Sequence, residues 1–189
     1  ITPAQLALDP CTGSCIIMNP NTGELLASVS YPGYDSNRLA NNMDSAYYNS
    51  LLQDGSLPLY NNATQQTTAP GSTFKMVTAS AGLSEGAIDP GTVITDTGIF
   101  ERLGLKLKCW VYPRNHGSIT VSQAIRDSCN YFFAETAYRL SLSGDAYQEE
   151  KGLNAIAKYA TEFGLADKTN IEIPEGTPKI ADEFPIDAS

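Results

Sequence analysis

Ser72 and Lys75 lie three positions apart in the stretch "APGSTFKMVTASAGLSEG", and together they could carry out nucleophilic chemistry. The stretch predicts a helix from Ser72 to about Ser84, and residues at i and i+3 share one helix face. A serine in the first turn lies at the positive end of the helix dipole, which favours a developing alkoxide. A lysine acts as a base when burial lowers its pKa, and Lys75 has apolar neighbours. Taken alone, such a tetrapeptide is more often a helix cap beside a surface lysine.

A second polar pair, Ser128 and Asn130, occurs in "DSCNYFF". The pattern predicts one helix over 120–128, opened by a capping box of Thr120 and Gln123, and another over 130–141. The junction of two helices can direct two polar side chains into one cleft. Serine and asparagine are also the residues expected to cap a helix, and this pair taken alone favours that interpretation.

Composition limits the classes of protein that the chain can belong to. Its 189 residues, 42% of them hydrophobic, suffice for one domain or for part of a larger one. The net charge of −9, with no basic cluster, argues against nucleic-acid binding. No apolar run approaches the roughly 20 residues that span a bilayer. The first residues lack the features of a signal peptide, so we expect an excised segment of a longer protein.

Other segments predict the scaffold around these two pairs. Residues 14–30 predict a β-hairpin with a left-handed turn residue at Gly23, and its nearly continuous apolar runs predict that both faces are covered. Residues 44–55 and 147–164 predict helices, and the stretch "IEIPEGTPKIADEFPIDAS" predicts an extended tail.

The four cysteines indicate little chemistry of their own. Cys11, Cys15, Cys109 and Cys129 form no CxxC pair, and His116 does not complete a zinc set with them at any recognised spacing. We therefore expect no metal site and free, mostly buried thiols, although Cys11 and Cys15 are near enough in sequence to pair.

The order of the two polar pairs, and the sequences that flank them, favour a catalytic interpretation over helix capping. "STFK" precedes "SCN", with 56 positions from Ser72 to Ser128, and both lie in longer runs such as "PNTGELLASVSYPGYDSN" and "HGSITVSQAIRDSCNYFF". These runs resemble class B penicillin-binding proteins, the peptidoglycan D,D-transpeptidases, over nearly the whole chain. The approach "PLYNNATQ" is more similar to elongation-type than to division-type members. The resemblance implies a partial α+β penicillin-binding/serine β-lactamase-like fold, with the first two sheet strands and the helical subdomain.

The resemblance also implies roles for the four residues. Ser72 would be the acylated nucleophile, Lys75 its general base, Ser128 a proton relay and Asn130 the residue that binds the substrate amide. The substrate would be the D-Ala-D-Ala end of a peptidoglycan stem peptide, and β-lactam antibiotics would acylate the same serine. No cofactor or metal is implied. The parent protein would be anchored by a missing N-terminal helix, act on the extracytoplasmic face of the bacterial cytoplasmic membrane and work with cell-wall synthesis proteins such as a glycosyltransferase.

Two departures from the family pattern matter. The third motif of the family, K-T-G, does not occur; "DKTN" and "PKIA" are the nearest strings. We therefore expect residues 1–189 to be a truncated transpeptidase domain that is a poor catalyst alone. Cys129 stands where serine is commoner, and we expect it to be a buried, unreactive thiol.

Alternative functions stay open from the sequence. A serine β-lactamase or a β-lactam sensor domain would use the same nucleophile, and a lactamase would need a base such as Glu172 or Glu175 to activate water. A non-catalytic cell-wall scaffold is a third possibility. His116 has no visible acidic partner and is expected to be structural, and Trp110 with several tyrosines is expected to serve mainly in packing.

Overall fold

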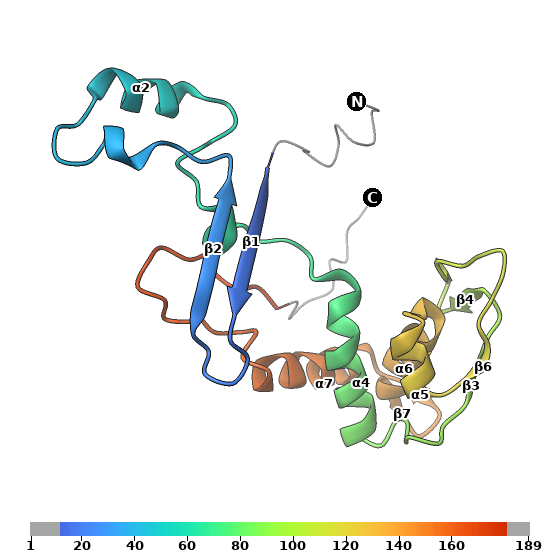
Figure 1. Cartoon of the computed structure of the whole chain (residues 1–189). Coiled ribbons are helices and arrows are strands. Elements are labelled where there is room, and N and C mark those ends of the chain that lie inside the picture. Colours follow the sequence, from blue (N-terminus) through green and yellow to red (C-terminus); the bar gives the residue numbers. More distant parts are fainter. Residues whose placement is uncertain (1–11, 181–189) are drawn as a thin grey trace. The chain divides into compact units, whose positions relative to one another are not determined.

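The structure is a computed structural model that describes residues 12–180, and these form two compact units (Figure 1). The first unit contains residues 12–68 and 168–177. The second contains the continuous stretch 69–167, together with 178–180. Each unit is described by itself below.

An antiparallel hairpin opens the first unit. Strands β1 (Gly13–Met18) and β2 (Leu25–Tyr31) pair from Gly13 opposite Tyr31 to Met18 opposite Leu25. The turn between them uses Gly23 at φ 74°, a left-handed conformation that glycine adopts without steric cost. The predicted hairpin and its turn residue are thus confirmed. One register shift, between Ile17 and Met18, accommodates an extra residue in β2.

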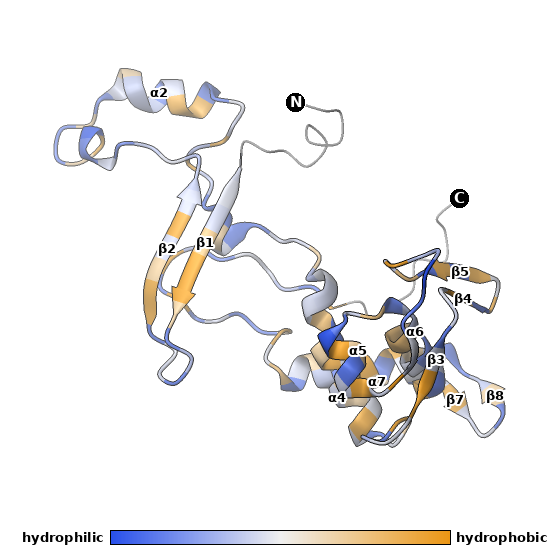
Figure 2. Ribbon diagram, turned by 45° about the vertical axis from the view of Figure 1, so that its right-hand side comes forward, coloured by the Kyte–Doolittle hydropathy of each residue, from blue (hydrophilic) through white to orange (hydrophobic). Residues whose placement is uncertain are grey.

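The hairpin exposes much of its apolar surface, which corrects the prediction that both faces are covered. It forms a sheet of only two strands, so within the described residues too little chain packs against it. Figure 2 shows hydrophobic residues along both strands. The exposed apolar side chains are Ile16, Ile17, Met18, Leu25, Leu26 and Val29.

Two helices and a returning segment complete the first unit. Helix α2 (Ser45–Gln53) begins after Asp44, whose carboxylate accepts a hydrogen bond from the Tyr47 N–H at 3.0 Å. The short helix α3 (Asn62–Gln65) was not predicted from the sequence. Residues 168–177 return to it: Thr64 Oγ1 donates to the Pro174 carbonyl at 2.7 Å, and the Gly176 N–H donates to the Thr64 carbonyl at 2.7 Å.

Helices dominate the second unit, as predicted, and small antiparallel strand pairs lie beside them. Together with the hairpin of the first unit they confirm the predicted α+β class. No helix among residues 12–180 is long and apolar enough to cross a membrane. The helices are α4 (Lys75–Ser84), α5 (Val121–Arg126), α6 (Asn130–Leu140) and α7 (Glu149–Glu162). The strand pairs are β3 (Ile94–Asp96) with β6 (Gly117–Ile119), β4 (Ile99–Arg102) with β5 (Leu105–Lys108), and β7 (Leu142–Ser143) with β8 (Ala146–Tyr147).

The core of the second unit joins the helices to β3 and β6. Phe132 and Ala124 are fully buried in it. Glu135 on α6 is also buried, and it is compensated by two arginines, Arg102 Nε at 2.9 Å and Arg139 Nε at 3.1 Å. The buried cluster comprises Ala79, Ile88, Ile94, Cys109, Ile119, Val121, Ala124, Cys129, Phe132 and Phe133.

The close approach of Ser141 explains why a glycine, Gly152, interrupts the amphipathic sequence of α7. A β-carbon there would lie 2.0 Å from Ser141 Oγ and 3.1 Å from the Ser141 nitrogen. We expect Gly152→Ala to lower the free energy of unfolding by about 1–3 kcal/mol through overpacking. Alanine's better helix propensity, worth about 1 kcal/mol, works in the opposite direction. Urea denaturation followed by circular dichroism measures the difference.

Two variants separate this clash from a general effect of the substitution. Gly55→Ala places a β-carbon where nothing lies within 4 Å, so we expect a change within about 0.5 kcal/mol. Ser141→Ala combined with Gly152→Ala removes the clashing oxygen and should recover part of the loss. Equal destabilisation by the single and the double variant would contradict the close approach.

Candidate active site

Lys75 is the centre of a polar cluster in the second unit. Its Nζ lies 2.6 Å from Asn130 Oδ1, 2.8 Å from the Ser128 carbonyl oxygen, 2.9 Å from Ser128 Oγ and 3.2 Å from Ser72 Oγ. Ser128 Oγ also donates to Ser72 Oγ at 3.1 Å. The four residues singled out from the sequence therefore form one hydrogen-bonded group.

The local backbone at Ser72 places its hydroxyl beside the amine. Residues Gly71–Phe74 form a 3₁₀ turn that leads directly into α4. Ser72 makes no capping hydrogen bond with its side chain, so the helix-cap interpretation is wrong for this serine. Its side chain is exposed, while Lys75 is half-buried one turn later.

The backbone at Ser128 is more unusual. Ser128 has φ 51°, in the left-handed region that non-glycine residues rarely occupy. This turn separates the end of α5 from the start of α6, and it lets both oxygens of Ser128 face Lys75. Cys129 rather than Ser128 or Asn130 caps α6, because its Sγ accepts from the Phe132 N–H at 3.4 Å. The capping interpretation of the polar pair is therefore wrong, and both of its side chains are directed to Lys75.

Burial lowers the pKa of the Lys75 amine, which favours its neutral form. A protonated amine has three N–H groups, whereas four oxygens lie within hydrogen-bonding distance of Nζ. The longest of these contacts is the one to Ser72 Oγ. In the neutral form the nitrogen lone pair can accept the Ser72 hydroxyl proton, and the two N–H groups can still be donated to two of the other three oxygens. The geometry thus suits proton transfer from Ser72 to Lys75.

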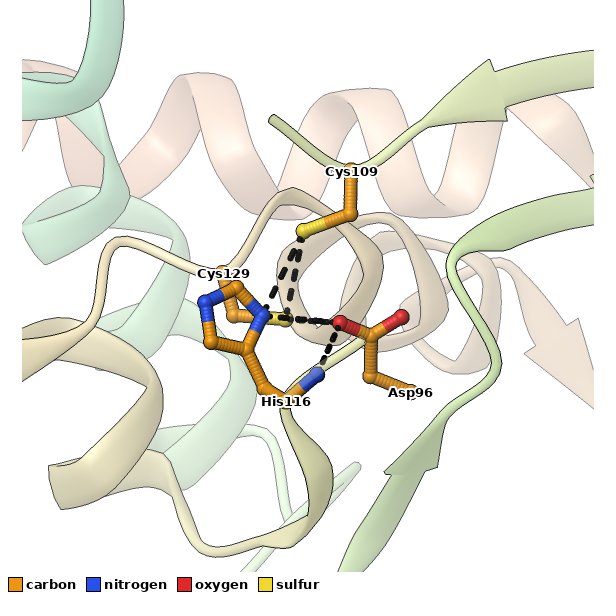
Figure 3. A group of neighbouring side chains, drawn as sticks. All are labelled: Asp96, Cys109, His116 and Cys129. Carbon is orange, nitrogen blue, oxygen red and sulfur yellow. Dashed lines mark hydrogen bonds and ion pairs between the residues drawn. The ribbon is translucent and has the colours of Figure 1, made fainter. Parts of the chain in front are cut away.

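A second polar cluster lies beside Cys129, the residue between Ser128 and Asn130 (Figure 3). His116 Nδ1 lies 2.8 Å from Asp96 Oδ2, and Cys129 Sγ lies 3.4 Å from the same oxygen. Cys109 Sγ lies 3.5 Å from His116 Nδ1 and 3.8 Å from Cys129 Sγ. His116 therefore has an acidic partner, which corrects the expectation drawn from the sequence.

The ionisation of this cluster follows from its burial. Burial, together with the neighbouring Cys109 and Asp96, raises the pKa of the Cys129 thiol to about 12. Burial alone would raise the pKa of Asp96, but hydrogen bonds from Gly98 and His116 outweigh it and lower that pKa. Near neutral pH, Cys129 is therefore a neutral thiol beside the ionised carboxylate of Asp96.

The same four residues could hold a metal ion. One ligand atom from each of Asp96, Cys109, His116 and Cys129 lies within 4.8 Å of the others. Thiolate, imidazole and carboxylate are the ligands that Zn²⁺ takes in tetrahedral sites. The absence of a recognised ligand spacing in the sequence therefore did not mean that these four residues lie far apart. Tertiary structure brings together residues that match no recognised ligand spacing, so the sequence offered no signal for Asp96 and none that would join it to the cysteines and His116.

The remaining residues singled out from the sequence lie outside these clusters. Glu175 is engaged within the first unit, where its carboxylate accepts hydrogen bonds from the Thr169 and Asn170 backbone N–H groups. Glu172 is exposed in the same unit. Trp110 is 64% exposed, so it is not a packing residue within the described chain, and its Nε1 donates to the Asp127 carbonyl at 3.1 Å. Cys15 is exposed, and Cys11 lies outside the described residues.

A serine hydroxyl beside a half-buried lysine defines the class of serine enzymes that transfer acyl groups with lysine as the base. The family model described as the penicillin binding protein transpeptidase domain matches residues 13–189. The chain belongs to this family, which confirms the predicted family and fold.

Curated relatives agree with this assignment. The chain is 32% identical over 164 residues to the peptidoglycan D,D-transpeptidase MrdA of Acinetobacter baumannii, covering 86% of this chain and 23% of that protein. It is 36% identical over 167 residues to the peptidoglycan D,D-transpeptidase PbpA of Mycolicibacterium smegmatis, covering 82% and 31%. The chain thus spans about a quarter to a third of the length of these relatives.

Solved structures are similar over nearly the whole chain. Penicillin-binding protein PBP2 from Helicobacter pylori matches with a TM-score of 0.77 and 25% identity, covering 95% of this chain and 32% of that one. Penicillin-binding protein A from M. tuberculosis, as an imipenem acyl-enzyme complex, matches with a TM-score of 0.71 and 28% identity, covering 88% and 38%.

Proposed function

We propose that this chain carries the nucleophilic half of a peptidoglycan D,D-transpeptidase that cross-links stem peptides through a serine acyl-enzyme. The observation that carries the proposal is the contact of Lys75 Nζ with the oxygens of Ser72, Ser128 and Asn130. Family membership and the names of the curated relatives support the same reaction.

The first half of the reaction forms the acyl-enzyme. Neutral Lys75 takes the Ser72 proton as Ser72 Oγ attacks the carbonyl carbon of the penultimate D-Ala. The Ser72 backbone N–H stabilises the oxyanion of the tetrahedral intermediate. When the intermediate collapses, the C–N bond breaks, and the leaving D-Ala amine receives the proton from Lys75 through Ser128 Oγ. Asn130 holds Lys75 and the amide of the acyl donor.

The second half returns the enzyme to its starting state. An amine of a neighbouring stem peptide attacks the ester carbonyl and loses a proton through Ser128 and Lys75. The ester bond then breaks, and Ser72 Oγ recovers its proton, so the net result is exchange of one amide for another. A β-lactam follows only the first half, since its opened ring stays tethered to the acyl group.

We propose further that the domain is completed by residues beyond these 189, including a strand with the K-T-G motif. That strand would supply the second oxyanion N–H group and bind the substrate carboxylate. The family resemblance suggests that the parent protein is elongation-type, anchored in the bacterial cytoplasmic membrane and active outside it, and the relatives' names support peptidoglycan cross-linking as its task. A similar structure is a complex of PBP2 with MreC from Helicobacter pylori, which supports cell-wall synthesis proteins as partners.

Acylation by benzylpenicillin tests the function. We expect the full-length protein to gain one penicilloyl group on Ser72, located by peptide mass spectrometry, and to keep it for minutes or longer. A β-lactamase would instead release the product within seconds, and a non-catalytic scaffold would gain no adduct. Fast stoichiometric acylation of residues 1–189 alone would contradict the proposal that the missing strand is required.

Two substitutions of Asn130 test whether its side chain acts on the reaction through direct contact with Lys75. Asn130→Ala removes the oxygen at 2.6 Å from Nζ, and we expect acylation to slow by about 10–100-fold, the range for loss of one hydrogen bond to a charged group. Asn130→Asp keeps an oxygen there but adds a negative charge, which raises the pKa of Lys75. Its rate should therefore recover toward the original value as the pH rises, whereas the alanine variant should stay slow. Identical pH profiles for the two variants would contradict direct contact with Lys75.

A further inference from the structure

A groove beside the candidate active site has one residue of the Lys75 cluster in its wall. The groove has a volume of about 550 Å³, and its wall is formed by residues of the second unit from 110–116 and 126–128. Ser128 lines the groove, and its Oγ also lies 3.1 Å from Ser72 Oγ. We call it the Trp110 groove, after the aromatic residue in its wall. It therefore extends from the residue that relays protons in the proposed reaction.

The proposed reaction brings two amines to Ser128 in turn. The leaving D-Ala amine receives its proton through Ser128 Oγ, and the attacking amine of the second stem peptide returns a proton by the same route. Because the second half of the reaction runs this proton path in reverse, the attacking amine must occupy the place that the leaving amine vacates. The acceptor peptide that carries this amine then needs a surface that extends from Ser128, and the Trp110 groove is such a surface.

Trp110 presents an aromatic surface of fixed orientation to a peptide in the groove. Its side chain belongs to a residue that is 64% exposed. Its Nε1 donates to the Asp127 carbonyl at 3.1 Å, and the centre of the His116 ring lies 6.0 Å from that of the indole. Because these contacts hold the indole in place before a ligand arrives, little conformational entropy is lost on binding. Rigid, exposed aromatic side chains of this kind are favoured at binding surfaces.

The charged groups of the groove favour a carboxylate. Arg126 forms a bidentate pair with Asp127, with Nε 2.7 Å from Oδ1 and Nη2 2.8 Å from Oδ2, so its charge is compensated. Arg114 is exposed, and its guanidinium makes no hydrogen bond, ion pair or ring contact with any residue of 12–180. Its positive charge lines a groove in a chain whose net charge is −9. A guanidinium without a partner suits bidentate binding of a carboxylate.

We propose that the Trp110 groove binds the acyl acceptor, an extended peptide that carries a carboxylate apart from its attacking amine. Trp110 packs against the peptide, Arg114 pairs with the carboxylate, and the amine lies beside Ser128. The groove then selects which amine reaches the ester on Ser72, whereas the acyl donor is bound by other residues. This inference rests on the proposed function and adds a specificity site to the second half of that reaction.

Aminolysis of the acyl-enzyme tests the role of Arg114. The full-length protein is acylated by an N-benzoyl-D-alanyl thioester and supplied with L-Ala-γ-D-Glu-L-Lys or its meso-diaminopimelate analogue, whichever it cross-links faster. We expect Arg114→Gln to raise the KM for this acceptor roughly 3–10-fold, the effect of losing a partly exposed ion pair. The same peptide with all of its carboxylates converted to amides should show equal KM values for the two proteins. Lys106→Gln, which removes a 77% exposed amine outside the groove, should leave the acceptor KM unchanged.

Substitution of Trp110 tests the aromatic contact. Trp110→Leu should raise the KM for the acidic and the amidated peptide alike, because packing against an indole does not depend on the charge of the peptide. Trp110→Phe keeps an aromatic ring and should recover part of the loss. A change in KM for the acidic peptide alone would overturn the assignment of Trp110 as a packing surface for the acceptor.

Two further measurements separate this site from the donor site and from the proposed function. Arg114→Gln should slow aminolysis and not the acylation of Ser72 by the thioester; equal slowing of both steps, or an unchanged acceptor KM, would overturn the proposal. Saturation-transfer NMR of the acidic peptide with Ser72→Ala reads the groove without the reaction, and added Arg114→Gln should weaken that signal. If Ser72 is never acylated in the unmodified protein, the proposed function fails, while the NMR signal still reports the peptide in the groove. An NMR signal that Arg114→Gln leaves unchanged would overturn the site itself.

Discussion

Ser72→Ala is expected to abolish covalent labelling by β-lactams completely, because no other atom of the candidate site can take the place of its hydroxyl oxygen. The substitution keeps the β-carbon and removes one exposed oxygen, so the fold should be unchanged. Cross-linking of stem peptides should fall by about 10³-fold or more, to the level that binding alone supports. Intact-protein mass spectrometry after benzylpenicillin treatment measures the first effect, and product chromatography measures the second.

Thr73→Ala is the matched control for Ser72. It removes a neighbouring exposed hydroxyl whose only described contact is a hydrogen bond to the Pro70 carbonyl at 2.6 Å. We expect labelling of this variant at close to the original rate. A covalent adduct on Ser72→Ala, or an equal loss in both variants, would show that the nucleophile lies elsewhere.

Lys75→Met is expected to slow acylation by about 10²–10⁴-fold, the range for loss of a general base. Methionine has a similar length and fills the half-buried space, but it cannot accept the Ser72 proton. It also leaves oxygens of Ser128 and Asn130 without a donor, so the unfolding free energy should be measured alongside. Stopped-flow acylation with a chromogenic cephalosporin gives the rate. Lys158→Met, which removes an exposed amine paired with Glu85, should leave that rate unchanged.

The pH dependence of acylation provides an independent test of the role of Lys75. Only the neutral amine is a base, so the rate should rise with pH and level off above the pKa of Lys75. Because burial lowers that pKa, the rise should occur at lower pH than for an exposed lysine. Lys75→Met should lose this rise. A flat profile in the unmodified protein would contradict the assignment of Lys75 as the base.

The sequence was sufficient to identify the family and the four residues, Lys75 included, that lie together in the second unit. Neither polar pair could be interpreted alone, since Ser72 and Ser128 each suit a helix cap. Their order, together with the long flanking runs, carried the assignment. The hairpin and the helices were also predictable, because glycine and capping residues such as Thr120 mark their ends. The short helix α3 lacked an apolar periodicity and was missed.

Other features depend on contacts distant in the sequence and could not be predicted. The left-handed backbone at Ser128 is uncommon for serine, and nothing in "DSCNYFF" indicates it. The cluster of Asp96, Cys109, His116 and Cys129 forms only when β3, β6 and the α5–α6 junction pack together. Local spacing rules describe ligands held by one loop, so they failed for a set collected from several elements.

The discontinuous first unit has a consequence for protein synthesis. Thr64 and its partner Pro174 are 110 positions apart, and the whole stretch 69–167 is made between them. At about 5–20 residues per second, a ribosome needs roughly 5–20 s to reach Pro174 after Thr64. The hairpin and α3 are therefore synthesised long before the segment that returns to α3, and the helical unit is complete only a few residues before Pro174. Nascent chains would therefore be most exposed to aggregation, and most in need of a chaperone, in this interval.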